Sequence, residues 1–359
     1  MLNKLKKLSP ATRTNFLTYL GVIVAFAILQ PLAVQGKLSP TLQGQLVPIC
    51  AYVVMTLSLN LTVGVLGELS LGHAGFMSVG AFSGAVAASA LQYAIPNGGL
   101  RLAVAMVIGA VFAGVVGVLI SVPVLRLNGD YLAIVTLAFG QIIKSIVENL
   151  YIGVDGKGAL RAGFLKPLTG LGEGGRMIVN GPMGIPNIAE ISSFVAGFVL
   201  ILVTLAVIFN LVNSRAGRAI MAIRDNRIAA ESVGLNITKY KMMAFVTSAA
   251  LAGAAGTLFA LGQPAIVASK FDFNTSILIL VYVVLGGQGK MWGSIIAATF
   301  LTVLPETPAM RGLADYRMLV YAVVLIVVML VTNSPAIKSF FSRFQKDADR
   351  ETAKGGEQA

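Results

Sequence analysis

The chain has 359 residues, of which 56% are hydrophobic and 12% are charged. In soluble globular domains roughly a quarter of the residues are charged, so the composition excludes that class and indicates an integral membrane protein. The net charge of +12 does not indicate nucleic-acid binding, because the basic residues lie between apolar runs without an array of aromatics. The single Cys50 and single His73 exclude a disulfide framework and His-rich metal chemistry within one chain.

The predicted fold is an all-α polytopic bundle of about ten membrane segments, since a membrane-spanning helix needs about 20 apolar residues. The long apolar runs are 16–34, 45–66, 74–94, 102–123, 131–152, 191–212, 242–261 and 316–332. The first run follows a basic start, as in a signal peptide. It is longer than a usual signal segment and lacks a small-residue cleavage site, so we interpret it as an uncleaved first span.

Two shorter runs, 275–285 and 292–304, are separated by GGQGKMWG and form either two tilted spans or one re-entrant hairpin. Lysine and arginine near the span ends favour a cytoplasmic position for both termini. The predicted organisation is therefore a basic cytoplasmic tail (1–15), a transmembrane domain (16–334) and a second cytoplasmic tail (335–359). Within the domain, 153–190 is an outer loop and 213–241 is a cytoplasmic loop.

Three glycine-containing breaks interrupt the predicted spans, at 64–76, 125–141 and 285–293. Irregular backbone at membrane depth is tolerated where it is covered by protein or lines a water-filled path, although each break is also consistent with an ordinary interfacial turn. The predicted path residues are Gly72, His73, Gly75, Tyr131, Thr136, Gln141, Gly286, Gly287 and Gly289. His73 is equally consistent with a packed, hydrogen-bonded side chain.

Small residues at helical spacing predict close helix packing in the membrane. They are Gly80 with Gly84, Ala110 with Gly114 and Gly117, and Gly253 with Gly256. Lys144 and Glu148 lie one turn apart within a span, where charges indicate a functional role by default, but this pair is able to neutralise itself.

The loop 213–241 is the longest polar interruption and contains the basic residues Arg215, Arg218, Arg224, Arg227, Lys239 and Lys241. Asp225 or Asn226 is suited to cap a helix, and Gly234 is suited to end it. The pattern predicts about two turns of helix at 227–233, which is too short to be stable alone in water. The loop is therefore either a solvated connector or a partner-binding element.

Catalytic and nucleotide-binding motifs are not found in the sequence. GGQGKM at 286–291 lacks the preceding glycine and the following Ser or Thr of a phosphate-binding loop. Ion-coupled carriers usually bury acidic residues near the middle of the membrane. Here the carboxylates Glu68, Asp130 and Glu148 all lie near the ends of predicted spans, which disfavours such a carrier. Energy for uphill movement is then expected from a partner.

Five ordered segments resemble the permease subunits of branched-chain amino acid ABC importers, in particular the Liv-type, M-like permease: 68–82, 127–143, 180–186, 214–236 and 285–298. The resemblance implies a homologous second permease, two ABC ATPase subunits that carry the ATP, an extracytoplasmic solute-binding protein and a place in the bacterial cytoplasmic (inner) membrane. It implies no catalytic residue, metal or cofactor bound by this chain. The implied cargo is a branched-chain or other hydrophobic amino acid; the alternatives are a urea or short-amide permease of the same family and a stand-alone secondary carrier.

The resemblance also assigns roles to two loops. The short helix in 213–241 corresponds to a coupling helix that docks on the ATPase. Its implied residues are Arg224, Asp225, Arg227, Ala229, Ala230, Glu231 and Gly234. Ile228 stands where importers of the general pattern have glutamate, which puts the contribution of an acidic residue there in doubt. The outer loop would meet the binding protein, with Gly181, Pro182 and Gly184 as contact candidates.

Overall fold

The computed structural model describes residues 10–37, 39–92, 94–127, 129–155, 160–168 and 175–304, together with 319, 323 and 326. The described helices are α2 (Pro10–Val34), α3 (Pro40–Asn60), the π-helical η1 (Leu61–Leu66), α4 (His73–Ala90), α5 (Gly98–Val124), α6 (Asp130–Glu148), η2 (Gly181–Met183), α7 (Phe194–Asn213), α8 (Arg215–Asp225), α9 (Arg227–Ser232), α10 (Ile237–Ala260), η3 (Ala268–Lys270), α11 (Phe273–Gly286) and α12 (Met291–Val303). The predicted span 316–332 and the tail 335–359 fall almost wholly outside the described residues.

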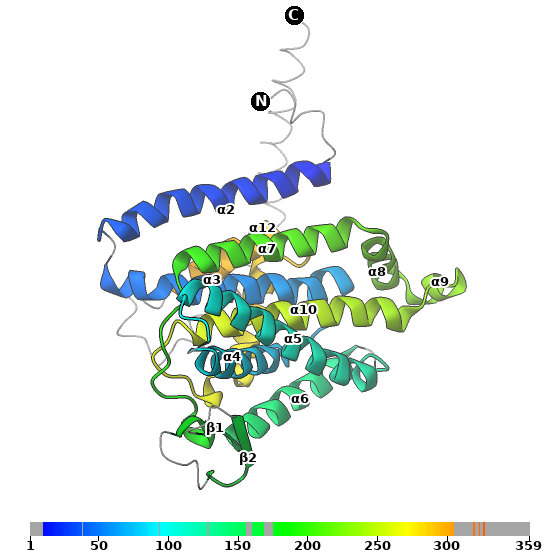
Figure 1. Cartoon of the computed structure of the whole chain (residues 1–359). Helices are drawn as coiled ribbons and strands as arrows, with labels where there is room; N and C mark the ends of the chain where they lie inside the picture. The colour runs from blue at the N-terminus through cyan, green and yellow to red at the C-terminus, as the bar shows by residue number, and fades with distance from the viewer. Residues whose placement is uncertain are drawn as a thin grey trace, which may run out of the picture. The chain divides into compact units, whose positions relative to one another are not determined.

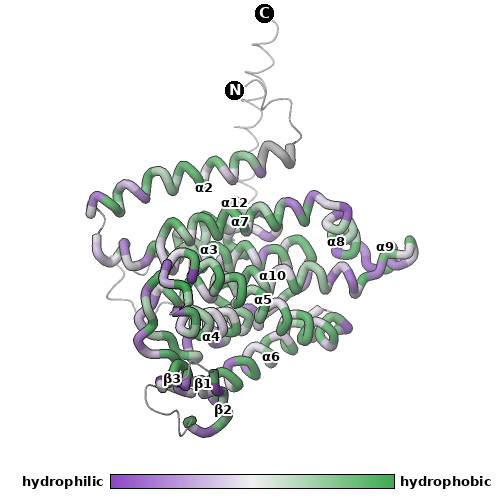
Figure 2. The backbone as a smooth tube through the Cα atoms, viewed as in Figure 1, coloured by the Kyte–Doolittle hydropathy of each residue, from purple (hydrophilic) through white to green (hydrophobic). Residues whose placement is uncertain are grey.

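Within the described part of the chain, seven helical segments are long and apolar enough to cross a membrane, which confirms a polytopic helical bundle. They correspond to α2, α3 with η1, α5, α6, α7, α10, and η3 with α11. Figure 2 shows the predominantly hydrophobic course of these helices. Helix α4 is outside this set, because its glycines and serines lower its mean hydropathy. Most of its residues are buried in the bundle.

Helix starts follow capping residues in the sequence. The side chains of Ser39, Asn97, Ser193 and Asp272 each accept a hydrogen bond from a backbone N–H in the first turn of α3, α5, α7 and α11. A capping side chain satisfies one of the N–H groups that the helix leaves without a partner. The polar residues between the apolar runs therefore mark where these four helices begin.

Helix α10 packs against α4 and α5 through small residues, as predicted (Figure 1). A Cβ on Gly80 would overlap the backbone of Gly253, and one on Gly256 would overlap the carbonyl of Met77. Thr257 donates its hydroxyl hydrogen to the Gly80 carbonyl over 2.8 Å. On α5 the closest approach is made by Gly109 and not by the predicted Ala110. These backbone-to-backbone contacts form the rigid centre of the bundle.

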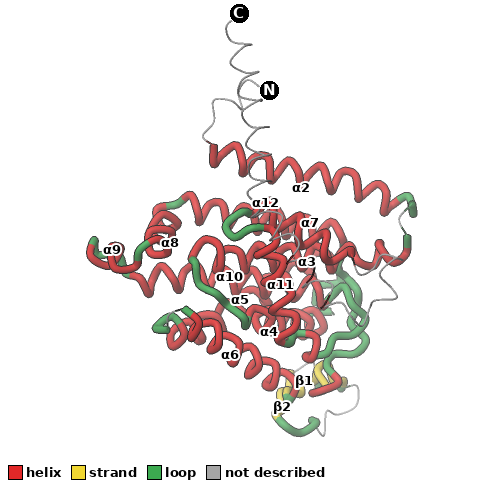
Figure 3. Tube along the Cα trace, turned by 180° about the vertical axis from the view of Figure 1, so that it is seen from behind, coloured by secondary structure: helices red, strands yellow, loops and turns green. Residues whose placement is uncertain are grey.

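The predicted span 131–152 is wrong at its end, because α6 stops at Glu148 and the chain continues into a strand. Strands β1 (Leu150–Val154), β2 (Leu160–Phe164) and β3 (Arg176–Asn180) form an antiparallel sheet in the order β2-β1-β3 (Figure 3). Ile152 pairs with Ala162 on one side and Val179 on the other. The outer loop thus adds a small sheet to the helical bundle.

The sheet-containing loop and the α8–α9 region lie at opposite ends of α10 (Figure 1). Residues 215–236 precede α10, while Ile266, which follows it, pairs with Ile185 of the outer loop through backbone hydrogen bonds of 2.9 and 3.1 Å. Because a helix rises about 1.5 Å per residue, the 24 residues of α10 separate these two regions by about 36 Å. That length is sufficient to cross the hydrocarbon core of a bilayer.

Candidate functional site

The first predicted break contacts both of the others. The N–H of Leu71 donates to the Thr136 hydroxyl over 3.0 Å, and a Cβ on Gly72 would overlap the Thr136 carbonyl. Gly75 lies against Gly140 in the same way, at 3.1 Å from its would-be Cβ to the Gly140 Cα. The absence of side chains at Gly72 and Gly75 therefore lets the start of α4 cross α6 closely. The structure brings Gly72, Gly75 and Thr136 together.

Asn60 joins the first break to the third. Its side chain is fully buried; its oxygen accepts from the Gly289 N–H over 2.8 Å, and its nitrogen donates to the Ser294 hydroxyl over 2.8 Å. Gly64 is one turn further on, and a Cβ there would overlap the Gly289 backbone. A buried amide with both ends bonded holds two elements in one register. Sequence analysis did not single out Asn60, because an apolar run with one asparagine carries no signal for its distant partner.

The third break is a tight turn between α11 and α12. Gly287 and Gly289 have φ of +91° and +79°, and Gly286 contacts the Gly293 backbone. With η3, α11 forms a 19-residue segment of spanning length, whereas α12 has 13 residues. The two short runs, predicted as either two tilted spans or one re-entrant hairpin, thus form one helix of spanning length and one shorter helix.

His73 is a packed residue and not a free one. It is 1% exposed, and its Nε2 lies 2.8 Å from the Ser58 hydroxyl. That hydroxyl donates to the Met55 carbonyl over 2.8 Å, so it accepts the hydrogen of His73 Nε2. The ring also packs edge-on against Phe76 at 6.0 Å. The structure supports the packed alternative for His73.

Two predicted path residues lie apart from this junction. Tyr131 is 74% exposed on α6, whose buried face instead includes Leu132, Thr136 and Gly140. Gln141 is half-buried and comes directly after Gly140 in the sequence, so it lies beside that face. Lys144 and Glu148 form an i,i+4 ion pair at 3.7 Å with partly exposed side chains, which agrees with self-neutralisation and contributes little to stability.

The predicted short helix in 213–241 is present as α9, from Arg227 to Ser232. The Asn226 side chain, and not Asp225, caps it by accepting from the Ala229 N–H over 3.0 Å. Its end is a Schellman motif: Gly234 has φ +81°, its N–H donates to the Glu231 carbonyl, and the Leu235 N–H donates to the Ala230 carbonyl. Local sequence therefore defines both ends of this helix.

Helix α8 precedes α9 and was not predicted. The Ser214 hydroxyl caps it by accepting from the Gly217 N–H over 3.1 Å, and Ala219, Ile220 and Ile223 are buried along one face. Ile223 packs with Ala230 of α9 and Ile237 of α10. The signal was available, because a serine before apolar residues at helical spacing marks a helix start. Ala230 is thus structural, while Arg227, Ala229 and Glu231 are exposed.

Two polar contacts tie the α8–α9 region to the first break. Arg224 donates from Nη1 to the Gly64 carbonyl over 3.0 Å and binds Asp225 Oδ1 through Nε and Nη2. Lys241, whose side chain is 4% exposed, forms an ion pair with Glu68, which is 14% exposed. Gly64 and Glu68 belong to the segment where α3 changes to π-helical geometry and then ends at Gly67 with φ +80°. The loop is therefore anchored to the broken segment and is more than a solvated connector.

The outer-loop candidates separate into buried and exposed residues. Gly181 and Gly184 are buried, with φ of +52° and +71°, and a Cβ on Gly184 would overlap the Ile266 carbonyl. Pro182 and its neighbour Met183 are exposed. The two glycines therefore shape this loop, and Pro182 with Met183 forms its accessible surface.

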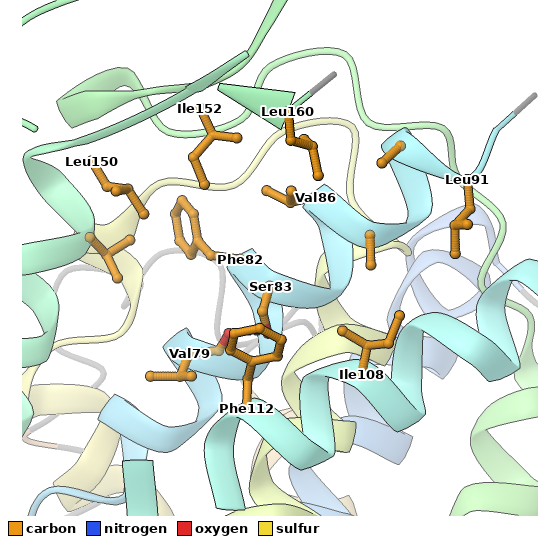
Figure 4. Close-up of a pocket in the computed structure, with 13 residues that line it drawn as sticks. Val79, Phe82, Ser83, Val86, Leu91, Ile108, Phe112, Leu150, Ile152 and Leu160 are labelled. Carbon is orange, nitrogen blue, oxygen red and sulfur yellow. Dashed lines mark hydrogen bonds between the residues drawn. The ribbon is translucent and has the colours of Figure 1, made fainter. Parts of the chain in front are cut away.

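A large apolar pocket of about 510 Å³ lies beneath the sheet, between α4, α5 and β1–β2 (Figure 4). Phe82, Val86, Phe112 and Ile152 are among its lining side chains, and the one polar side chain, Ser83, already donates to the Val79 carbonyl over 2.6 Å. Such a lining offers no partner to a charged solute. This pocket does not suit a zwitterionic cargo.

The family follows from comparison with known proteins. A family model described as branched-chain amino acid transport system / permease component matches residues 42–329. The chain belongs to this family. The permease is 35% identical over 290 residues to the high-affinity branched-chain amino acid transport system permease protein LivM of Salmonella typhimurium, and equally to LivM of Escherichia coli K12. Each alignment covers 78% of this chain, and the chain spans 66% of the length of each of these relatives.

The ribose import permease protein RbsC of Escherichia coli K12 is a more distant relative, 27% identical over 279 residues, which cover 76% of this chain and 78% of RbsC. No solved structure matches the permease significantly. Family membership together with the apolar helices makes the chain a multi-pass protein of the bacterial inner membrane.

Proposed function

We propose that this permease forms the membrane path of an ATP-driven importer of branched-chain amino acids. Its family and the transport function named for the LivM relatives support this cargo class. In the proposed assembly a homologous second permease completes the path, two separate ATPase subunits bind the ATP, and a solute-binding protein delivers cargo at the opposite end. This chain itself binds no nucleotide and carries no catalytic residue.

The observation that carries the proposal is the α8–α9 arrangement. A six-residue helix is too short to persist in water by itself, yet α9 is capped at both ends and held by Ala230 against Ile223 and Ile237. This leaves Ile228 and Val233 exposed at 81% and 74%. Exposed large apolar side chains on a fixed, polar loop are typical of a docking surface. We assign this surface to the ATPase.

The outer end supplies the second contact in the proposed assembly. Pro182 and Met183 are exposed beside the buried glycines of the same loop, about 36 Å from α9 along α10. This separation supports delivery at one end and energy input at the other. Gly181 and Gly184 act by shaping the loop, so their substitution tests the loop's fold and not its contact.

The decisive test is co-purification with the ATPase subunits of the same system. Ile228→Asp should reduce the recovered ATPase about tenfold or more, because burying an isoleucine contributes about 1.5–3 kcal/mol. Met183→Asp is the matched control, since Met183 is 71% exposed at the other end. Equal ATPase recovery with both variants would refute the docking assignment.

Reconstitution tests the cargo and the energy source. Proteoliposomes that contain the whole complex should accumulate leucine only with ATP and binding protein, and neither urea nor ribose should compete. Accumulation of leucine by the permease alone, without ATPase subunits, would instead establish the stand-alone carrier.

A further inference from the structure

A second cavity, of about 350 Å³, lies where the carboxyl end of α4 and the amino end of α5 meet β3 and residues 187–191. It is at the same end of α10 as the outer loop, since Leu261 and Pro264 contribute to its lining. Two arginines, Arg101 and Arg176, also line it. Its volume is near the lower limit of small-molecule sites, which run from about 300 to 1,000 Å³.

Arg101 is a buried cation without a matching anion. It is 8% exposed, and its Nε has no hydrogen-bond partner. Among the described residues no carboxylate forms an ion pair with Arg101. Glu190, in the segment 187–191, is exposed and does not line the cavity. Burying an unpaired charge in a protein interior is strongly unfavourable, more so than burying a neutral polar group. A bound anion would remove this cost.

The backbone makes the same location still more positive. Arg101 is the fourth residue of α5, and the amino end of a helix carries a partial positive charge. A cation is normally unfavourable at this position. Arg176 approaches from β3 and is exposed, with Nη2 bonded to the Ser89 carbonyl at 3.1 Å and to Gln92 Oε1 at 3.0 Å. Ser89 is in the last turn of α4 and Gln92 directly follows that helix, so Arg176 is held at the cavity.

The end of α4 forms another part of the lining. Helix α4 ends at Ala90, and Ala88 and Ser89 of its last turn line the cavity, where the partial charge of the helix is negative. Aliphatic side chains complete the lining: Ile188, Ile191 and Leu261. One cavity thus combines a buried cation without an anion, a second arginine held at the end of α4, and an apolar surface. This combination is complementary to a carboxylate that carries a hydrocarbon side chain.

We propose that this cavity binds the carboxylate of a free aliphatic amino acid through Arg101. The proposal rests on the proposed function, because it places a cargo-binding subsite in the permease itself. In this arrangement Arg101 supplies the charge, Arg176 supplies a second, more exposed cation, and the isoleucines contact the side chain. The apolar pocket under the sheet offers none of these partners.

The test is binding of radiolabelled leucine to the full-length permease in phosphatidylcholine nanodiscs, without ATPase or binding protein. Arg101→Gln should weaken binding at least tenfold, and Arg101→Lys should recover part of the loss. The matched control is Arg161→Gln, which removes an arginine at the same end that is paired with Asp155 at 2.9 Å and lies outside the cavity. The control should bind leucine like the parent protein.

Competitors identify the recognised group. Leucine should displace the label, whereas leucinol, which lacks the carboxylate, should fail to do so. Equal displacement by leucinol, or equal binding by Arg101→Gln and Arg161→Gln, would overturn the proposal. Loss of leucine binding on adding phosphatidylglycerol would also overturn it, since the cavity would then hold a lipid phosphate.

Two further measurements keep the result interpretable. Arg176→Gln, at an exposed position, should also lower leucine affinity, so the proposal stays testable if Arg101→Gln does not fold. ATP-driven leucine uptake by the whole complex is measured separately for each variant. Normal uptake with unchanged leucine binding in both arginine variants would remove the subsite and leave the proposed function standing.

Discussion

The buried ion pair between Lys241 and Glu68 gives the sharpest prediction. It joins the first turn of α10 to the segment that follows η1, and the two side chains are 4% and 14% exposed. Glu68→Gln removes the negative charge and leaves an ammonium group that has little access to water. Breaking a buried pair from one side costs about 3–5 kcal/mol, because the remaining charge stays uncompensated. We expect Glu68→Gln to destabilise the permease by about this amount.

Removing the positive charge instead should lower the free energy of unfolding by less. Lys241→Met keeps most of the apolar stem and leaves Glu68, whose greater exposure gives it some hydration. The double variant Glu68→Gln/Lys241→Met removes both charges and should recover about 2 kcal/mol or more relative to the sum of the single losses, because replacing a buried pair by neutral groups is often nearly neutral. The size of this coupling energy measures the pair itself.

Reversible unfolding in mixed micelles with increasing SDS provides the free energies for the double-mutant cycle. Lys144→Met, in the more exposed pair with Glu148, is the control and should change stability by less than about 1 kcal/mol. If both single variants at the buried pair stay within about 0.5 kcal/mol of the parent, the site is hydrated and the reasoning from burial fails.

Two glycine substitutions test backbone geometry and close packing. Gly234→Val should strain the left-handed cap by about 1–3 kcal/mol and reduce ATPase co-purification, whereas Gly36→Val, also at positive φ with open space around it, should leave ATPase binding intact; equal ATPase recovery would contradict a role for the α9 cap. Gly80→Ala should cost about 1–3 kcal/mol in SDS unfolding because its Cβ meets the Gly253 backbone, while Gly44→Ala in α3 has nothing within 4 Å and should stabilise slightly. Similar effects of the two alanines would show that helix propensity outweighs packing.

The sequence was sufficient for most helix positions because hydrophobicity and capping are local properties. The predicted runs at 191–212 and 242–261 agree with α7 and α10, and the predicted end of α9 at Gly234 is confirmed by its Schellman motif. The error after Glu148 has a physical reason as well. LYIGV is apolar and β-branched, so its pattern fits the end of a membrane helix and a half-buried strand equally.

The site was only partly predictable, because its contacts join residues far apart in the chain. Glycine content located the three breaks, but it did not reveal that Asn60 bonds to Gly289 or that Gly72 crosses Thr136. The same limit hid Arg101: a lone arginine near a helix start indicates an interfacial position, and only the folded chain shows it buried without an anion.

The arrangement of contacts determines where a displacement of α8 and α9 acts first. In the core, Gly80 and Gly253 meet backbone to backbone, so no side chain is available there to absorb a shift. In contrast, Arg224 holds the Gly64 carbonyl in a π-helical segment, a geometry that is rare and less well bonded than an α-helix. Gly64 in turn lies against the Gly289 turn. We therefore expect a pull on α8 to reach the α11–α12 turn through this segment, while the close contacts among α4, α5 and α10 resist deformation.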